Sequence, residues 1–96
     1  MIQSFGSQTT EDLYHGLDTR EARKIPQTVW KTAQRKLDMI NTAVELKDFL
    51  AFPANRFEKL KGHRAGKYSI RINDQYRIVF KFQEGNAFQV EIVDYH

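Results

Sequence analysis

The sequence predicts an α+β fold, with helices in the first half of the chain and a small, twisted, mainly antiparallel β-sheet in the second half. Two patterns indicate this fold. Apolar residues recur every three or four positions over residues 27–44, as on one side of an amphipathic helix. From residue 67 onward apolar and polar residues alternate, as in half-buried strands joined by short turns. We expect the N-terminal helices to pack on one face of the sheet.

One domain is expected to span the whole chain, residues 1–96. The sequence contains no cysteine, which excludes disulfides and thiolate metal sites and suits the reducing cytoplasm. No apolar run is long enough to cross a membrane, and the first residues lack the basic and hydrophobic regions of a signal peptide. No Gly-rich phosphate loop or metal-ligand spacing is present. We expect a soluble cytoplasmic protein without a metal site, a cofactor or a membrane contact.

The N-terminal part of the chain is expected to form a short strand, a short helix and a loop. Residues 1–5 are mainly apolar and fit an edge strand. Thr9 and Thr10, followed by two acidic residues, mark a helix start, and Gly16 marks its end. The apolar side of this helix would consist of Leu13, Tyr14 and Leu17. Residues 18–24 are charged and lack periodicity, which predicts a mobile loop.

The main helix is predicted over residues 27–44, with Pro26 in its first turn. Its core-facing side would consist of Trp30, Ala33, Leu37, Ile40 and Val44. Its outer side would be basic and carry Lys31, Arg35 and Lys36. One further helical turn, with Leu46, Phe49 and Leu50 as its apolar residues, is expected before Pro53 stops it.

Three strands are predicted, over residues 67–73, 76–83 and 87–93, with turns between them. The face that packs on the main helix would consist of Tyr68, Ile70, Ile72, Ile78, Phe80, Phe82, Phe88, Val90 and Ile92. The opposite face would carry Arg71, Arg77 and Lys81. We expect the functional site on that polar face.

Positive charge is concentrated in two segments. Residues 17–36 hold six Lys or Arg against two acids, a net charge of +4, and residues 56–81 hold eight against two, a net charge of +6. The whole chain carries only +3, because the remaining stretches are acidic. This pattern indicates a surface that faces a polyanion, although incidental clustering of solvated charges would explain it equally well.

The sequence ends in Asp94, Tyr95 and His96 directly after a predicted strand, and Arg77 lies on the neighbouring strand. Histidine can take or give a proton near neutral pH, and arginine presents a planar, permanently charged fork to phosphate. These residue types suit metal-free RNA cleavage, in which the 2′-hydroxyl of RNA is the nucleophile. The alternative from spacing alone is a frayed C-terminus with a solvated histidine.

Several motifs resemble the HigB branch of the RelE toxin superfamily. They are NRFEKLKG at 55–62, RAG at 64–66, YSIRINDQYRI at 68–78 and EIVDYH at 91–96, and residues 1–5 are similar to the family's first strand. The detailed resemblance covers residues 43–96, a little over half of the chain. It implies a small twisted sheet with helices on one face. It also implies the toxin of a type II toxin–antitoxin system that acts as a ribosome-dependent mRNA endonuclease, an activity that many members of the superfamily have.

The resemblance implies roles for individual residues. Arg77 falls on the family's phosphate-binding arginine, and Lys61 on a lysine near the scissile phosphate. His96 would transfer a proton, Asp94 would orient it, and Tyr95 would stack on a base or hold the substrate. Further phosphates would be bound by Arg64, Arg71, Lys81, Lys31 and Arg35.

One departure from the family pattern concerns its histidine three residues before the lysine. That position is Glu58 here, so we expect a weaker or differently tuned nuclease. Whether Glu58 or His63, two residues after Lys61, takes over that role stays open. His15 and His63 are too far apart to suggest zinc, and His15 is expected at a helix end.

The resemblance also implies partners. These are a cognate helix-turn-helix antitoxin, similar to HigA, that forms a hetero-oligomer with the toxin, and the ribosome with its mRNA. The basic side of the main helix and residues 18–24 would contact ribosomal RNA phosphates.

Alternatives remain for the roles of individual residues and for the function of the whole protein. Arg77 could pair with Glu91 across the sheet, and Lys61, Arg64 and Arg71 could be ordinary surface charges. A ParE-like inhibitor of gyrase, or a degenerate toxin that only binds its antitoxin or RNA, would share much of this sequence pattern.

Overall fold

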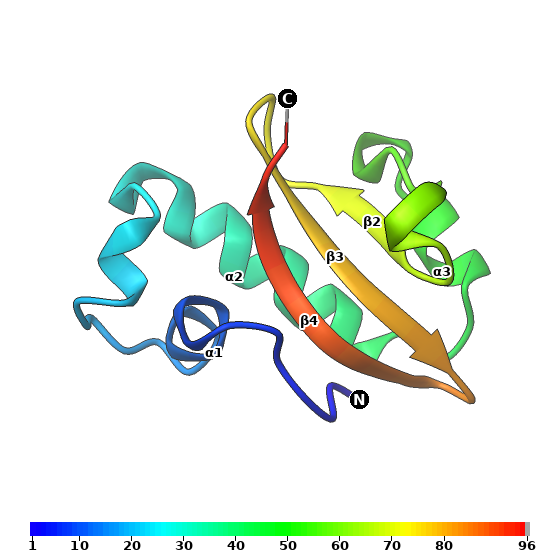
Figure 1. Cartoon of the computed structure of the whole chain (residues 1–96), viewed down its shortest axis with the longest axis horizontal. Coiled ribbons are helices and arrows are strands. Elements are labelled where there is room, and N and C mark those ends of the chain that lie inside the picture. The colour runs from blue at the N-terminus through cyan, green and yellow to red at the C-terminus, as the bar shows by residue number, and fades with distance from the viewer. Residues whose placement is uncertain (96) are drawn as a thin grey trace.

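The computed structural model describes residues 1–95, in which most of the helical elements precede the strands (Figure 1). The helical elements are α1 (Gln8–Tyr14), η1 (Ala22–Lys24), α2 (Gln27–Thr42), α3 (Lys47–Leu50), η2 (Pro53–Asn55) and η3 (Gly62–Arg64), where η denotes a 3-10 helix. The strands are β1 (Glu58–Lys59), β2 (Tyr68–Arg71), β3 (Tyr76–Gln83) and β4 (Asn86–Asp94). They form one antiparallel sheet in the order β1-β2-β3-β4. The predicted α+β class is confirmed.

The first helix, α1, begins earlier than the sequence predicts. Ser7 is its N-cap, and its hydroxyl accepts a hydrogen bond from the backbone nitrogen of Thr10 at 3.2 Å. Gly16 ends the helical turn with a left-handed φ of 71°, as predicted. Leu13 is fully buried, but Leu17 is 48% exposed and does not belong to the apolar side, because the chain turns away at Gly16.

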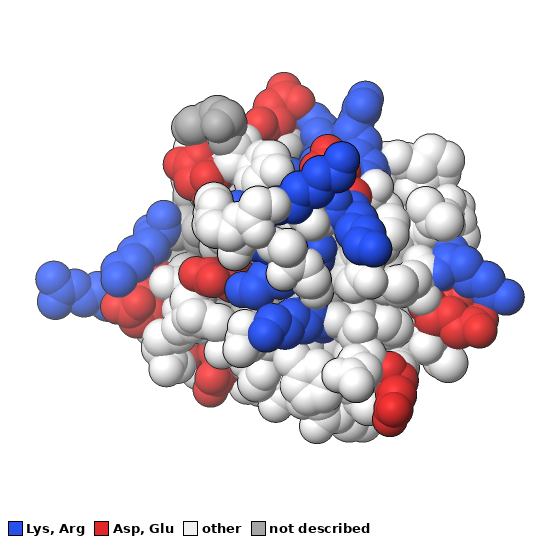
Figure 2. Space-filling model, turned by 45° about the vertical axis from the view of Figure 1, so that its right-hand side comes forward, with Lys and Arg blue, Asp and Glu red and all other residues white. Residues whose placement is uncertain are grey.

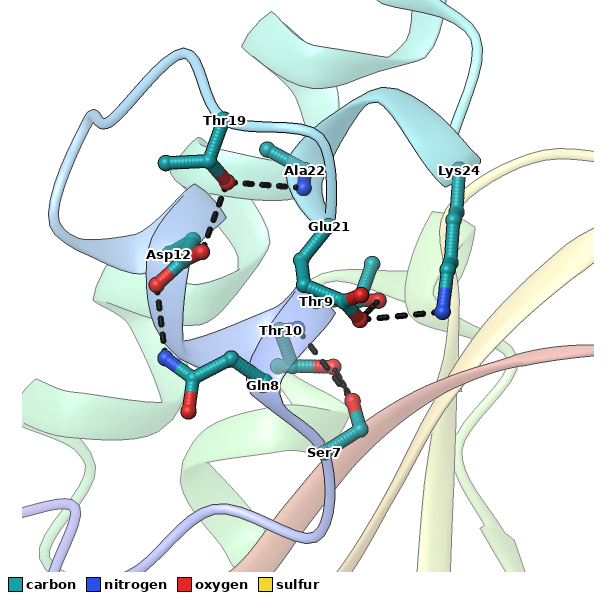
Figure 3. A network of polar contacts seen from close by, with 9 residues as sticks. All are labelled: Ser7, Gln8, Thr9, Thr10, Asp12, Thr19, Glu21, Ala22 and Lys24. Atoms are coloured by element: carbon teal, nitrogen blue, oxygen red, sulfur yellow. Dashed lines mark hydrogen bonds and ion pairs between the residues drawn. The ribbon is translucent and has the colours of Figure 1, made fainter.

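The segment after α1 is anchored to it rather than free. Figure 3 shows Thr19 between α1 and η1: its hydroxyl donates to Asp12 Oδ2 at 2.6 Å and accepts from the backbone nitrogen of Ala22 at 3.0 Å. Gln8 also donates to Asp12, at 2.7 Å. Ala22 is fully buried, so the segment 18–24, which was predicted as a mobile loop, contains a 3-10 turn packed on the core. Side-chain hydrogen bonds of this kind leave no periodicity in the sequence.

The main helix, α2, crosses behind the sheet and supplies one side of the core (Figure 1). Ala33, Leu37 and Ile40 are fully buried, as predicted. The helix ends at Thr42, and Val44 is therefore 70% exposed instead of facing the core. Lys36 is only 7% exposed, so its predicted place on the basic outer side is wrong. No helix within residues 1–95 is long and apolar enough to cross a membrane.

The sheet follows the predicted strands closely, apart from a β-bulge in β4. Gln89 has a left-handed φ of 53°, and Lys81 lies opposite Phe88 where the β3–β4 register shifts. Phe88 therefore shares the outer face with Lys81, and fully buried Ala87 faces the core. The predicted inward orientation of Phe88 is wrong, because strict alternation does not survive an inserted residue.

Two short segments complete the sheet. β1 pairs with β2 through Glu58 opposite Ser69, and it was not predicted because a two-residue strand carries no alternation. Residues 1–5 run parallel to β4 and form isolated bridges at Ile2 and Phe5. This confirms their place at the sheet edge, although they do not form a continuous strand.

Candidate functional site

A pocket of about 350 Å³ lies where the β1–β2 connection meets the end of β4. It is lined by Leu60, Lys61, His63, Arg64, Asp94 and Tyr95. Four of these residues were predicted as site residues from the sequence, and they come from two segments about thirty positions apart. Figure 2 shows Lys and Arg side chains gathered near the middle of one face of the molecule, with further Lys and Arg side chains beside acidic ones at its left and right edges.

The β1–β2 connection has a defined conformation that aims its side chains at the pocket. Leu60 is buried, and its backbone nitrogen donates to the carbonyl of Lys67 at 2.9 Å, which closes the connection. Gly62 has a φ of 68°, a left-handed value that favours glycine, and it starts the 3-10 turn η3. His63 and Arg64 lie on that turn and reach the pocket beside Lys61.

The other wall of the pocket is the end of β4. Asp94 pairs with Tyr76 of β3, and its Oδ2 accepts a hydrogen bond from Gln75 Nε2 at 3.1 Å. The backbone nitrogen of Tyr95 donates to the carbonyl of Gln75 at 2.6 Å. The β2–β3 turn therefore holds both residues in place. His96, predicted as the proton-transfer group, lies outside the described residues.

Arg77 is only 7% exposed, and it is not among the residues that line this pocket. Its Nε donates to the hydroxyl of Ser69 at 2.9 Å, and its Nη2 donates to the carbonyl of Arg56. Its guanidinium carbon lies 5.6 Å from the centre of the Tyr95 ring. The register sets Arg77 opposite Val93, so it is not directly across from Glu91. Arg77 was expected on an open polar face; in the structure, the segment before β1 and Tyr95 cover it.

The segment that covers Arg77 is held by the core. Asn55 is fully buried; its Oδ1 accepts a hydrogen bond from Lys36 Nζ, and its Nδ2 donates to the carbonyl of Phe49 at 3.0 Å. Phe57 stacks on Phe49, with ring centres 5.6 Å apart and planes within 7°. Between these anchors Arg56 has a left-handed φ of 43°, which turns its carbonyl toward the sheet. We call this group, formed by Lys36, Phe49, Asn55, Arg56 and Phe57, the clamp. The sequence did not predict the clamp, because its residues come from separate segments of the chain.

Two arginines approach the Tyr95 ring. Arg64 lies 5.9 Å from the ring centre, measured from its guanidinium carbon, close to the 5.6 Å of Arg77. Both distances fall within the range of cation–π contacts. The Tyr95 ring thus contacts both a half-buried cation that lines the pocket, Arg64, and a buried cation, Arg77.

The remaining predicted phosphate-binding residues lie outside the pocket. Arg71 lies opposite Arg77 in the β2–β3 pair and forms an ion pair with Asp74. Lys81 is exposed on the outer face of β3. Lys31 and Arg35 are exposed on α2. None of these four residues lines the pocket.

The charges on α2 and β2 are close enough to affect one another. Burial lowers the pKa of Lys36 below its ordinary value, and the nearby positive charges of Arg35 and Arg71 lower this pKa further. Lys36 is therefore a structural residue of the clamp, while Arg35 and Arg71 flank it toward solvent.

The two residues considered for the missing histidine differ in position. Glu58 is exposed on β1 opposite Ser69, and it does not line the pocket. His63 lines the pocket. His15 caps the end of α1 and packs against the rings of Phe5 and Tyr14, which confirms its expected place at a helix end. Residues 1–95 contain no group of three His, Cys, Asp or Glu that could hold a metal ion.

Two curated proteins are similar to this chain in sequence. Toxin HigB-1 of Vibrio cholerae is 36% identical over 87 residues, which cover 91% of this chain and 90% of that protein. The Endoribonuclease HigB of Proteus vulgaris is 36% identical over 61 residues, covering 64% of this chain and 65% of that protein.

Solved structures with low sequence identity share the fold. YoeB in the YoeB–YefM complex from Staphylococcus aureus matches with a TM-score of 0.59 and 21% identity, covering 100% of this chain and 98% of that one. YafQ from Escherichia coli matches with a TM-score of 0.57 and 14% identity, covering 98% of this chain and 91% of that one. Residues 3–96 match the family model described as the RelE-like toxin of the type II toxin–antitoxin system HigB. The chain therefore belongs to the HigB-like family of RelE-like toxins.

Proposed function

We propose that this toxin is an endoribonuclease that cleaves mRNA on the ribosome through attack of the RNA 2′-hydroxyl on the neighbouring phosphate. The observation that carries the proposal is the pocket, where Lys61 and Arg64 from one segment meet Asp94 and Tyr95 from another. The relative from Proteus vulgaris, named an endoribonuclease, supports the same activity.

The residues at and next to the pocket would have different roles in the reaction. Lys61 and Arg64 would bind the phosphate oxygens, where negative charge grows in the transition state. Arg77, next to the Tyr95 ring, would add positive charge through Nη1, because Nε and Nη2 are already engaged with Ser69 and Arg56. Tyr95 would stack on a base next to the scissile bond. The products would be a 2′,3′-cyclic phosphate and a 5′-hydroxyl.

His96 and Asp94 complete this scheme as predictions from the sequence. His96 would transfer a proton, and Asp94 would orient it. Asp94 is already held by Gln75 at the end of β4, which would give a neighbouring imidazole a fixed partner.

The ribosome would supply the positioning that a pocket of this size lacks. Six residues line it, too few to select a codon in free RNA, and positioning accounts for a large share of the rate in such reactions. Arg71, Lys81, Lys31 and Arg35 would contact surrounding phosphates. We place this activity in the cytoplasm, where translation occurs.

We also propose a helix-turn-helix antitoxin as the partner that holds the toxin inactive in a hetero-oligomer. Family membership in a type II toxin–antitoxin system supports an antitoxin of some kind. YoeB, a protein of the same fold, forms a heterotetrameric toxin–antitoxin complex with YefM in Staphylococcus aureus, which supports a hetero-oligomer here as well.

The test is a reconstituted translation reaction with a defined mRNA, in which new 5′ ends are mapped. We expect ribosome-dependent cuts with wild-type protein, and strongly reduced cuts with Lys61→Ala, Arg64→Ala, Arg77→Ala and His96→Ala. Lys47→Ala, at an exposed lysine of α3, is a charge-matched control that should cut normally. Folded wild-type protein that makes no cuts would refute the nuclease and favour a toxin that only binds, or one that inhibits gyrase.

A further inference from the structure

His63 is the one histidine within the described residues that lines the pocket. It shares the pocket with two cations, a carboxylate and a phenol, which belong to Lys61, Arg64, Asp94 and Tyr95. Nothing in the phosphate-binding scheme requires an imidazole at this position. The imidazole of His63 therefore has no role in the scheme described so far.

Cleavage through the 2′-hydroxyl needs two proton transfers. A base takes the proton of the 2′-hydroxyl as the bond from its oxygen to phosphorus forms, and an acid gives a proton to the 5′-oxygen as the bond from phosphorus to that oxygen breaks. Lysine, arginine and tyrosine side chains ordinarily titrate at about 10 or above and carboxylates at about 4, whereas imidazole titrates at about 6.5. Among the residue types lining the pocket, histidine is best matched to either transfer at neutral pH.

The local structure presents His63 to the pocket on a short, closed connection. The Leu60–Lys67 backbone hydrogen bond closes the connection, and the backbone nitrogen of Ala65 donates to the carbonyl of Gly62 at 3.0 Å across η3. Glu58, the other residue considered for this role, lies before the connection and does not line the pocket. The turn therefore brings the imidazole of His63 to the pocket, whereas the carboxylate of Glu58 does not reach it.

We propose that His63 is a catalytic residue of this toxin, one of the two groups that move a proton during RNA cleavage. The inference rests on the proposed endoribonuclease function and assigns it a second imidazole besides the predicted His96. The two histidines would divide the tasks, one accepting the 2′-hydroxyl proton and the other protonating the 5′-oxygen. No oxidant, metal ion or water is consumed in this step.

The experiment measures single-turnover cleavage of a defined mRNA on programmed ribosomes, with toxin at saturating concentration and over a range of pH. The variant is His63→Asn, which keeps a polar side chain of similar size but cannot titrate. The matched control is His15→Asn, at the far end of α1. A second RNA carries sulfur in place of the bridging 5′-oxygen at the cut site, because a thiolate leaves without needing an acid.

We expect His63→Asn to lower the saturated cleavage rate by about 10²-fold or more and to remove one limb of the pH–rate profile. His15→Asn should cleave as the wild type does. Recovery of the rate on the sulfur-substituted RNA would assign His63 as the acid, whereas an equal loss on both RNAs, with one pH limb missing, would assign it as the base. Both results support the proposal.

Other results overturn it. A variant that cleaves within a few-fold of wild type, or that loses only ribosome affinity while keeping both pH limbs, would make His63 at most an RNA contact. Thermal unfolding of the variant shows whether it is folded, and restoration of the His63→Ala rate by added imidazole gives a second readout independent of stability. Absence of cleavage by wild-type protein would instead refute the endoribonuclease function itself.

Discussion

The guanidinium carbon of Arg77 lies 5.6 Å from the centre of the Tyr95 ring, and Arg77 is only 7% exposed. The aromatic ring therefore covers a cation that the proposed reaction needs near the phosphate. An aromatic ring in this place can have two roles. It contacts the guanidinium of Arg77 in the free protein, and it can stack on an RNA base when RNA is bound.

Tyr95 should consequently act through its ring and not through its hydroxyl. Tyr95→Phe should cleave within about threefold of wild type, because stacking on a base depends on the ring. Tyr95→Ala should lose about 1–3 kcal/mol of stacking, which corresponds to roughly 5- to 150-fold weaker half-saturation by programmed ribosomes. Titration of cleavage rate against toxin concentration checks this, and equal losses in the two variants would contradict a stacking role.

Arg77 should contribute to both folding and cleavage. Arg77→Gln leaves the Ser69 hydroxyl and the Arg56 carbonyl without their donor, which should cost about 1–3 kcal/mol of unfolding free energy. In a domain of this size that lowers Tm by several degrees, at ~4–8 °C per kcal/mol. Arg77→Lys keeps the charge but not the fork, so cleavage should still fall on the order of 10²-fold.

Ser69→Ala separates the two effects of Arg77. It removes one acceptor of the guanidinium while Arg77 itself remains, so the stability cost should be about 1 kcal/mol. Cleavage measured well below Tm should then change little. If Ser69→Ala and Arg77→Lys lost cleavage equally, Arg77 would act only by supporting the fold.

The elements that periodicity can detect were predicted well. The α2 stripe and the alternation in β2 and β3 reflect burial on one side, which leaves a direct mark on the sequence. Lys36 was wrongly predicted although its spacing fits the buried side of α2. It lies three residues after buried Ala33 and seven after buried Val29, on the edge of the same stripe. Its residue type suggested solvent, and only the partner Asn55, nineteen positions away, makes its burial tolerable.

The parts of the site that escaped prediction depend on contacts between distant segments. The motifs drew attention to Lys61, Arg64, Asp94 and Tyr95, and the structure brings these residues to one pocket. The burial of Arg77 could not be foreseen, because it follows from the carbonyl of Arg56, a residue in a left-handed conformation within an aperiodic segment. The bulge at Gln89 likewise has no glycine to signal it.

The pair formed by Lys36 and Asn55 should be a main determinant of stability. Asn55→Ala removes the acceptor of a buried ammonium group, which should destabilise the protein by about 2–3 kcal/mol. Urea unfolding should show a lower midpoint with an unchanged m-value. The double variant Lys36→Met/Asn55→Leu should lose less unfolding free energy than Lys36→Met and Asn55→Leu lose together, since the double variant leaves neither partner unpaired. Additive losses would contradict the coupling.

Lys36 should also make stability rise with pH on the alkaline side. Burial, aided by the charges of Arg35 and Arg71, lowers the pKa of Lys36 below its ordinary 10.5. Between the lowered pKa and 10.5 the unfolded chain holds more protons than the folded one, so the free energy of unfolding increases with pH across that window. Lys36→Met should flatten this rise in urea titrations at a series of pH values. Equal slopes in wild type and variant would argue against a lowered pKa.

Grafting a histidine onto β1 tests how far His63 already meets the need for proton transfer. Glu58 pairs with Ser69, whose hydroxyl binds Arg77, so a histidine at position 58 would lie on the face of the sheet that carries Arg77. Glu58→His should raise cleavage, since imidazole is better matched to neutral pH than a carboxylate. The gain should be modest, at about tenfold or less, while His63 is present, and larger in the His63→Asn background, where a proton-transfer group is missing.

The measurement compares the saturated single-turnover rates of wild type, Glu58→His, His63→Asn and the double variant, with Glu58→Gln as the control for loss of the carboxylate. A gain of the same size in both backgrounds would mean that the two positions act independently, and no gain in either would mean that a histidine on β1 does not reach the reacting atoms.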